Sequence, residues 1–368
     1  MAGMLHVDSV IQADLALREL RINVAQVRDR SFPFVRRPRP HRNWHLYDLA
    51  QTHELAEVLH LIRLVVATDT AERPPPPCSR RGGRPRVPLG DRLTILLWQS
   101  YRGAANRPAE GDLRIIGLGL SRRFSYKTLE RAYSDPEVIA ALPRLLAITN
   151  RPLRGLETIF SIDGSGFPTT VRDHHRRERE RQDGTQRDAG YLTSGSHACV
   201  RNVANVGVRY GVVAGWKSWT DGHLPEVHGY REVFGQTRMN HPGMTQQLGD
   251  GAYAIREIVG QTVEAGVSCR FLPKGNANLK SNGVAGWKPS YWGLVVNPQG
   301  WLAEYHLRSV SEVVWEAMKI RPPRKILKRL GGRRETEARL RAVTYNLRRL
   351  AYLKWTEGGL RMDQIAAG

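Results

Sequence analysis

Four polar side chains in the last third of the chain are spaced so that they could act together on one substrate. Tyr305, Arg308, Glu312 and Lys319 follow one another in steps of three, four and seven residues. At about 100° per residue, these steps return to one face of an α-helix. An aromatic ring, two cations and a carboxylate on one face suit a groove that holds a metal ion and a phosphate backbone. The plainer alternative is a solvated helix face held by an ion pair at the Arg–Glu spacing.

Asp163 could supply a second carboxylate. It directly follows an apolar, β-branched run, 158–162, and is itself followed by Gly164 and Gly166. Such a run predicts a buried strand, and we expect the strand to end at Asp163, with the carboxylate at a strand terminus and open backbone around it. A turn formed by the Asp-Gly pair is the alternative that needs no function.

Asp250 is a third acid in a comparable setting. It begins the sequence Asp-Gly-Ala-Tyr, after which the pattern predicts a helix over 253–265. Capping of that helix by the Asp250 side chain would explain this residue without any chemistry. The preceding segment, 244–248, is also less apolar than a buried strand should be.

Taken together, these neighbourhoods resemble bacterial insertion-sequence DDE transposases. The resemblance is to the subgroup with a Tyr-x2-Arg-x3-Glu-x6-Lys signature, which this chain matches at every position, and it covers about residues 84–355. The segments that share in it outside the signature are 83–89, 125–129 and 345–350. The resemblance implies an α/β fold with an RNase H-like mixed sheet flanked by helices.

The resemblance also implies which acids do the chemistry. The catalytic and metal-binding residues would be Asp163, Asp250 and Glu312. The long, arginine-rich excursion at 171–188 and the polar segment before Asp250 depart from the family pattern. If another acid takes the middle place, it would be Asp173 or Asp221.

The reaction implied is a metal-dependent phosphoryl transfer. Three carboxylates can hold two Mg²⁺ ions, or Mn²⁺ in their place, about 3.5–4 Å apart, because hard divalent ions prefer oxygen ligands. The DNA would be nicked at the element ends and then joined to target DNA. Arg308 and Lys319 would bind phosphates, and Tyr305 would pack on or hydrogen-bond to the DNA. A nuclease that cuts without joining and a decayed, non-enzymatic DNA-binding protein are the alternatives.

The charge balance also points to nucleic acid. The 368 residues include 56 Lys and Arg against 35 Asp and Glu, a formal net charge of +21, and such an excess favours a phosphate backbone as partner. The charge gathers in an arm at 28–42, in a linker at 80–86, and in a strip over 319–361 with fourteen basic and three acidic residues. Solvation of the surface is the plainer alternative. The basic residues expected to contact DNA here are Arg84, Arg86, Arg324 and Lys325.

Apolar spacing predicts the elements that must position these residues. Helices are predicted over 46–67, from Gly90, over 112–118, over 125–133, from Pro136, over 253–265, from Ser309 and over 335–352. Strands are predicted over 158–162, 198–206, 209–216, 269–272 and 291–296. This order favours an α/β or α+β catalytic unit after residue 152. The short helices before it suit either a helix-turn-helix-like module or a plain packing domain.

We therefore divide the chain into four parts. These are N-terminal helices with a basic arm and linker (1–82), a helical DNA-binding domain (83–152), an RNase H-like DDE catalytic domain (153–357) and a tail (358–368). No stretch approaches the ~18 apolar residues that a membrane span needs. The cysteines, Cys78, Cys199 and Cys269, are too far apart for a Cys-x-x-Cys zinc site and make no disulfide framework. We expect a cytoplasmic, nucleoid-associated protein that binds double-stranded DNA at the terminal repeats and in the target. By the resemblance, it would act as a homodimer on two element ends.

Overall fold

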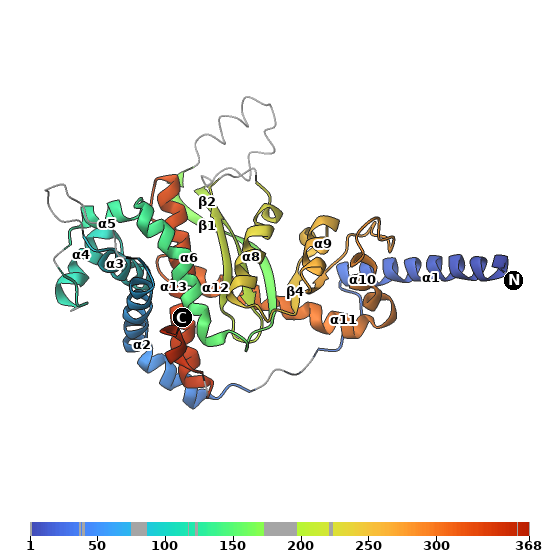
Figure 1. Cartoon of the computed structure of the whole chain (residues 1–368), viewed down its shortest axis with the longest axis horizontal. Helices are drawn as coiled ribbons and strands as arrows, with labels where there is room; N and C mark the ends of the chain where they lie inside the picture. The colour runs from blue at the N-terminus through green and yellow to red at the C-terminus, as the bar shows by residue number, and fades with distance from the viewer. Residues whose placement is uncertain are drawn as a thin grey trace, which may run out of the picture.

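The middle of the molecule is a mixed sheet with helices on both faces (Figure 1). The computed structural model describes residues 2–36, 38, 41–74, 87–116, 118–121, 124–172, 197–220, 224–358 and 360–367. The strands within these residues are β1 (Ile159–Arg172), β2 (His197–Gly207), β3 (Val213–Trp219), β4 (Gln246–Gly249) and β5 (Ser268–Phe271).

The strand order across the sheet is β3-β2-β1-β4-β5. β1 and β2 are antiparallel, as are β2 and β3, whereas β1, β4 and β5 run parallel to one another. β1 is therefore the central strand, with a partner on each edge. The predicted α/β class, with a mixed sheet flanked by helices and a helical N-terminal region, is confirmed.

β1 is longer than the sequence predicts. The strand does not end at Asp163 but continues to Arg172, because β2 pairs with it beyond that point, with Asp163 opposite Ala204 and Pro168 opposite Cys199. The Asp-Gly pair forms no turn. Asp163 lies within the central strand instead of at its terminus, which corrects the prediction.

β4 is buried even though it is polar. Gln247 is 0% exposed, and its side-chain oxygen accepts a hydrogen bond from the Asn205 amide at 2.7 Å while its own amide donates to the Asn205 oxygen at 3.0 Å. A buried polar group is tolerated when it is hydrogen-bonded, and here two buried amides satisfy each other. The polarity of 244–248 is therefore no argument against a strand before Asp250.

The segment 291–296 is a helix and not the predicted strand. It lies in α10 (Trp287–Val296), whose buried residues recur at helical spacing, namely Trp287, Ser290, Tyr291 and Leu294. Periodicity alone cannot assign a short apolar run, and two of these buried positions precede the run.

Three other boundaries also differ. β3 begins at Val213 and not at 209, because Gly211 has a φ of +66° and belongs to the turn after β2. The helix predicted over 112–118 is α4 (Asn106–Ile115). The helix predicted over 253–265 is the shorter α9 (Arg256–Glu264), preceded by a 3₁₀ turn, Gly251–Tyr253.

The local start signals of two helices are confirmed. The Ser125 side chain accepts a hydrogen bond from the Thr128 N–H at the start of α5 (Tyr126–Ala132), and Pro136 is the first residue of α6 (Pro136–Asn150). The other helices of the described chain are α1 (Ala2–Arg28), α2 (Trp44–Ala71), α3 (Leu89–Arg102), α8 (Tyr230–Asn240), α11 (Pro298–Tyr305), α12 (Ser309–Ile320) and α13 (Gly331–Thr356).

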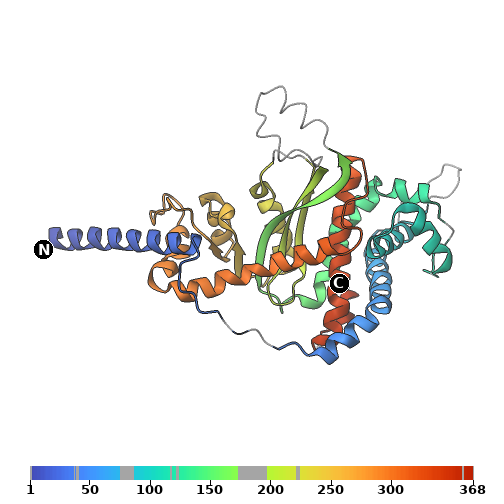
Figure 2. The same ribbon diagram turned by 180° about the vertical axis from the view of Figure 1, so that it is seen from behind.

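The helices divide between the two faces of the sheet. α8 packs on β2 and β3 in the same core as Phe160 and Ile162 of β1, and it lies in front of the sheet in Figure 1. α12 packs on β1 and β2 in the core that contains Phe167, and it crosses in front of the sheet in the reverse view of Figure 2. Side chains of α8 and α12 therefore reach the sheet from opposite sides.

α13 joins the helical region to the sheet. It packs against α2, α3 and α6 and also against β2 and β3. The buried Asn346 side chain accepts a hydrogen bond from the Val213 N–H at 2.8 Å and donates one to the Thr149 hydroxyl at 3.0 Å, so it ties β3 to α6. One hydrophobic core accordingly crosses the predicted boundary at residue 152.

A buried histidine supports β1 on the α8 side. His241 packs against Phe160, with ring centroids 4.9 Å apart, and its Nε2 lies 2.9 Å from the Asn150 side-chain oxygen. The Asn150 amide already donates to the carbonyl oxygens of Leu146 and Val213, so its oxygen accepts and Nε2 carries the proton. Nδ1 is then buried with no hydrogen-bond partner within the described chain.

This geometry predicts a pH dependence of stability. Burial lowers the pKa of His241 from 6.5 to about 4. The unfolded chain therefore takes up a proton below about pH 6.5 and the folded protein only near pH 4, so stability is lost as the pH falls through this window. We predict that this residue removes about 3 kcal/mol of unfolding free energy between about pH 7 and pH 4, measured by urea denaturation.

His241→Gln should lack this component, and His60→Gln, at an exposed site on α2, should keep it. An unchanged pH dependence in His241→Gln would contradict the assigned protonation state.

Candidate active site

The parallel register of β1 and β4 places two aspartates side by side. Ile162 of β1 pairs with Gly249 of β4. The residues that directly follow this pair are Asp163 and Asp250. Neighbouring strands lie about 4.8 Å apart, so the backbones of Asp163 and Asp250 lie side by side at the level where β4 ends. Burial raises the pKa of Asp163, and the negative charge of Asp250 raises it further.

Each aspartate is oriented by hydrogen bonds. Asp163 Oδ1 accepts from the Gly164 N–H at 3.0 Å, and its Oδ2 accepts from the Ser311 hydroxyl at 3.3 Å. Asp250 caps the 3₁₀ turn that follows it by accepting from the Ala252 N–H at 2.8 Å. Asp250 therefore caps this turn and not α9, the helix that it was predicted to cap, and its second carboxylate oxygen is free of that bond.

Ser311 was not indicated by the sequence patterns. It is buried, it stands directly before Glu312, and its hydroxyl also lies 2.9 Å from the Arg308 carbonyl oxygen. Ser161 of β1 reaches the same carbonyl at 3.1 Å. These two hydroxyls attach the start of α12 to the strand that carries Asp163.

The predicted polar stripe lies on an almost continuous helical rod. Tyr305 ends α11, residues His306–Arg308 form a 3₁₀ turn, and α12 begins at Ser309, all with right-handed helical backbone. Figure 2 shows this rod in orange, crossing the sheet toward α13. Lys319 lies near the far end of α12 and is partly buried.

Arg308 is a cation on which two acids of the site act. Its guanidinium pairs with Glu312 at 3.1 Å and lies over the Tyr305 ring, 5.4 Å from the centroid. Burial alone would lower the pKa of Arg308, but Tyr305, Glu312 and Asp163 raise it on balance. Arg308 thus lies in the field of acids from both β1 and α12.

Tyr305 is more buried than a DNA-contacting ring should be. It is 5% exposed and stacks on Trp301, with centroids 5.3 Å apart. Burial raises the pKa of Tyr305, Arg308 lowers it, and Asp250 and Glu312 raise it further. In this conformation the ring packs against the guanidinium of Arg308. Direct contact between the ring and DNA would require the ring to become exposed.

Glu312 does not join the two aspartates in this conformation. Its side chain is 59% exposed and is held by Arg308. Across the described parts of the chain, no three Asp, Glu, His or Cys side chains are close enough together to hold a metal ion. The structure therefore brings Asp163 and Asp250 together and leaves Glu312 beyond Arg308.

A fourth acid stands at this site without having been predicted. Glu226 begins a 3₁₀ turn, Glu226–Gly229, that leads into α8, and its carboxylate packs against the Gly164 backbone. Burial raises the pKa of Glu226, and the charges of Asp163 and Asp250 raise it further. The sequence around residue 226 does not indicate this role. Glu226 comes close to β1 only because the chain folds back after β3.

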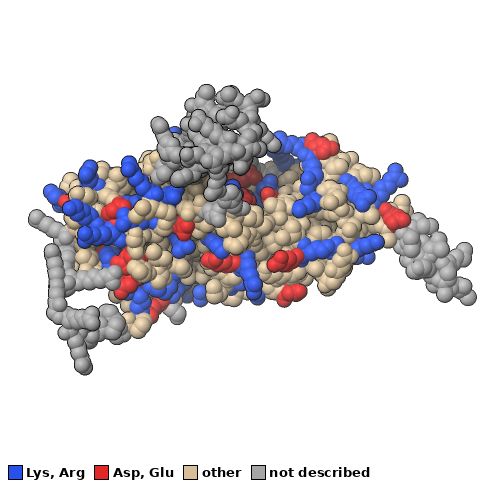
Figure 3. Space-filling view, turned by 90° about the horizontal axis from the view of Figure 1, so that it is seen from above, with Lys and Arg blue, Asp and Glu red and all other residues tan. Residues whose placement is uncertain are grey.

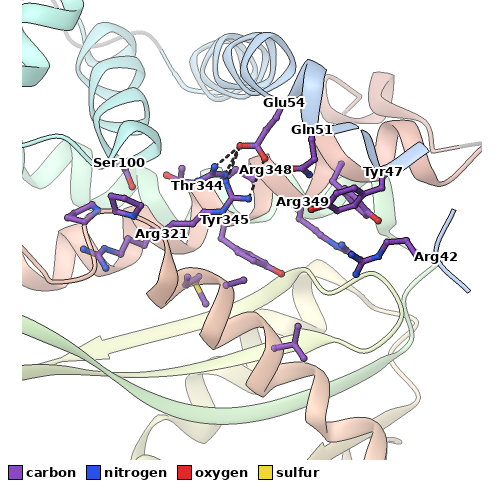
Figure 4. Close-up of a pocket in the computed structure, with 17 residues that line it drawn as sticks. Arg42, Tyr47, Gln51, Glu54, Ser100, Arg321, Thr344, Tyr345, Arg348 and Arg349 are labelled. Carbon is purple, nitrogen blue, oxygen red and sulfur yellow. Dashed lines mark hydrogen bonds and ion pairs between the residues drawn. The ribbon is translucent and has the colours of Figure 1, made fainter. Parts of the chain in front are cut away.

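Glu54 neutralises part of the predicted DNA-binding strip (Figure 4). It projects from α2 into a cavity of about 340 Å³ beside α13 and accepts hydrogen bonds from Arg321 at 3.1 Å and Arg348 at 3.0 Å. Other ion pairs of the strip join Lys328 and Arg333 to Glu130, Arg341 to Glu337, and Lys354 to Glu57. A count of basic residues therefore overstates the charge that this strip presents to a ligand.

Arg324 and Lys325 remain available. Both are exposed and form no ion pair within the described residues. They precede Ile326, whose backbone bonds to Pro168 and Thr170 near the end of β1, so they lie at the same end of that strand. Arg84, Arg86, Asp173 and Asp221 lie outside the described residues.

A second basic surface covers the helical region. Figure 3 shows Lys and Arg most densely at the left end of the molecule, where α4 and α5 lie in Figure 1. Exposed basic residues of these two helices are Arg107, Arg114, Lys127 and Arg131. Along the part of the chain that the structure describes, no helix is both long and apolar enough to span a bilayer.

Comparison with known proteins gives one informative similarity. No protein-family model matches the chain. A stretch of 144 residues is 29% identical to a protein of Archaeoglobus fulgidus named probable transposase for insertion sequence element ISA1214. The match covers 39% of this chain and 42% of that protein, so the chain spans less than half the length of its relative. Over that stretch, the chain is similar to a probable insertion-sequence transposase.

Proposed function

We propose that the chain is a DDE transposase that cuts DNA at insertion-sequence ends and joins it to target DNA, on an RNase H-like fold. The observation that carries the proposal is that Asp163 and Asp250 directly follow the paired residues Ile162 and Gly249 of two adjacent parallel strands. They lie beside the rod that bears Arg308, Glu312 and Lys319. The mixed sheet with helices on both faces agrees with this fold, and the similarity to a probable transposase supports the same class.

The donor set fits two hard divalent ions, Mg²⁺ or Mn²⁺. Asp163, Asp250 and Glu312 offer only carboxylate oxygens, which these ions prefer over the nitrogen and sulfur ligands of zinc. Burial raises the pKa of Asp163, and the negative charge of Asp250 raises it further, so the two carboxylates repel each other where they stand. When bound, two such ions lower the pKa of an attacking water or 3′-hydroxyl and stabilise the leaving oxygen.

Glu312 would join the aspartates by leaving Arg308. An exposed ion pair of this kind contributes at most about 1 kcal/mol, so its loss costs little compared with metal binding. Arg308, once released, has a guanidinium fork suited to a DNA phosphate beside the site. Lys319, about two turns further along the same helix face, would bind the next part of the backbone.

The partner of this site would be double-stranded DNA, at the terminal repeats of the element and in the target. A homodimer would let one complex hold two element ends. Nucleoid association would follow from binding to DNA.

A second candidate function is a non-enzymatic, decayed DNA-binding protein. The Arg308–Glu312 pair favours it, because an ion pair at this spacing needs no catalytic role. That protein would bind DNA but would show no metal-dependent cleavage at any pH.

Asp163→Asn and Glu312→Gln should each reduce Mg²⁺-dependent cleavage by more than about 100-fold. Each removes a proposed metal ligand, and even the loss of a group that only hydrogen-bonds to a ligand costs about 10–100-fold. Cleavage and joining are measured on labelled duplexes that carry the ends of the encoding element. Glu316→Gln, one turn further along α12, is the matched control and should keep the wild-type rate. Full activity in either variant would refute the assigned site, and a strand-transfer product would exclude a nuclease that only cuts.

Arg324→Ala and Lys325→Ala should each weaken binding to duplex DNA and reduce the slope of log K against log salt by about 1, the loss of one phosphate contact. Fluorescence anisotropy at several salt concentrations gives this slope. Arg321→Ala, a nearby arginine that Glu54 holds, should leave the slope unchanged. Equal effects of all three changes would show that the exposed pair has no special contact with DNA.

A further inference from the structure

We propose that the cavity between α2 and α13 binds a nucleotide, with its phosphate on Arg42 and Arg349. This inference goes beyond the proposed function, because Asp163, Asp250 and Glu312 are not among the described residues that line the cavity. Its volume of about 340 Å³ lies within the range of about 300–1,000 Å³ that is typical of small-molecule sites.

The walls of this α2–α13 cavity carry an excess of positive charge. Among the described residues that line it, Glu54 is the only acid, and the basic residues are Arg42, Arg321, Arg341, Arg348 and Arg349. Three of these arginines have an acidic partner within the protein. Arg321 and Arg348 bind Glu54, as Figure 4 shows, and Arg341 binds Glu337. The remaining two determine the charge that is left for a ligand.

Arg42 and Arg349 lie on the same pair of aromatic rings. The Cζ atom of Arg42 is 5.0 Å from the centroid of the Tyr47 ring, and that of Arg349 is 5.0 Å from the centroid of the Tyr352 ring. These two rings meet edge to face, with centroids 6.2 Å apart. Neither arginine forms an ion pair with a described residue. Two guanidinium groups gathered in this way suit a phosphate, whose oxygens accept hydrogen bonds from both.

The Arg349 side chain is held in place without being used up. Its Nε donates a hydrogen bond to the Tyr210 carbonyl oxygen. Its two terminal nitrogens make no hydrogen bond within the described chain. A side chain that is already oriented loses less conformational freedom when a ligand binds, so this arginine is prepared for an anion.

Tyrosine rings in the walls favour a nucleotide over a bare phosphate ion. Tyr47, Tyr345 and Tyr352 line the cavity and are only partly buried. The Tyr345 hydroxyl donates to the Gly211 carbonyl oxygen at 2.9 Å, which fixes the orientation of its ring. Aromatic side chains are common platforms for nucleobases, because every base has a π-face. A phosphate ion alone would leave these rings and most of the volume without a contact.

Two buried polar atoms of the walls are a second, independent sign of a missing ligand. Arg341 is 8% exposed, and its Nη1 has no hydrogen-bond partner within the described residues. The same holds for the Ser100 hydroxyl. Both residues line the α2–α13 cavity and an adjoining space of about 20 Å³. Buried polar atoms without partners are unfavourable, and a nucleotide, or a water molecule that it brings into the adjoining space, would satisfy them.

A role in folding explains Arg321 and Arg348 but not Arg42. The first two join α12 and α13 to α2 through Glu54. Arg42 is exposed and precedes α2, and its loss would leave no described carboxylate without a partner. Its contacts with aromatic rings contribute little at an exposed position. Removal of Arg42 therefore tests ligand binding without endangering the fold.

The test measures binding of deoxyadenosine monophosphate to the full-length chain by isothermal titration calorimetry. The buffer contains EDTA, so that no metal ion can carry the nucleotide. Arg42→Ala and Arg349→Ala should each weaken binding by about 10-fold, the loss of one hydrogen bond to a charged group. Arg209→Ala, which removes an exposed arginine from the Tyr210 ring outside the cavity, is the matched control and should keep the wild-type affinity.

Wild-type affinity in both variants would overturn the proposal. Thermal denaturation shows whether Arg349→Ala is folded, and if it is not, Arg42→Ala alone decides. Deoxyadenosine and inorganic phosphate should each bind at least about 10-fold more weakly than the nucleotide, because each makes only part of its contacts. Inorganic phosphate that binds as tightly as the nucleotide would contradict the role of the tyrosines.

A second probe distinguishes a free nucleotide from a nucleotide within a DNA strand. It is a single-stranded tetranucleotide with a 5′-phosphate, measured under the same conditions. Tighter binding of the tetranucleotide, lost in Arg42→Ala, assigns the cavity to a DNA strand, and tighter binding of the mononucleotide assigns it to a free nucleotide. If neither probe binds to the wild type, the proposal is wrong.

Failure of this inference differs from failure of the proposed function. Asp163→Asn should bind the nucleotide as the wild type does, since Asp163 lies outside the cavity. If the wild type cuts and joins DNA but binds neither probe, the inference is wrong and the transposase proposal stands. If nucleotide binding depends on Arg42 but the wild type neither cuts nor joins DNA, the cavity stands and the transposase proposal is wrong.

Discussion

The parallel register between β1 and β4 is the constraint on which the candidate site depends. It sets Asp163 and Asp250 at one height on neighbouring strands and partly buries Asp163. Two like charges so placed oppose folding unless positive charge is brought to them. Arg308 brings positive charge from the helical rod, and the Ser311 hydroxyl and the Gly164 N–H donate hydrogen bonds to Asp163. Under the proposed function, divalent ions would supply the positive charge that these groups leave missing.

Positive charge in this chain has two separate uses. Glu54, Glu57 and Glu130 bind basic side chains that follow α12, so those cations hold the helical region against α13. Arg324 and Lys325 stay exposed near the end of β1. The net charge of +21 predicts a nucleic-acid partner, but the acids that bind these cations decide which of them stay exposed.

Features that depend on near neighbours could be predicted from the sequence. The stripe from Tyr305 to Lys319 and the helix starts at Ser125 and Pro136 follow from spacing or capping within a few residues. Features that depend on distant partners could not. The length of β1 requires β2, and the burial of Gln247 requires Asn205.

The same distinction applies to the site. Asp163 and Asp250 were recognisable from their surroundings, whereas Ser311 gains a role only because α12 crosses β1 at that point. Glu226 meets Gly164 only after β2 and β3 have folded back along β1, so no local pattern could mark it.

The shared packing of α13 has a mechanical consequence. Because one helix is embedded both in the α2, α3 and α6 layer and against β2 and β3, a hinge at α13 would have to break the hydrophobic core that these layers share. Under the proposed function, DNA held by the helical layer would reach the aspartates at a fixed distance and angle. The distance between the helical layer and the aspartates would then set which phosphate is cleaved, without closure of one domain over another.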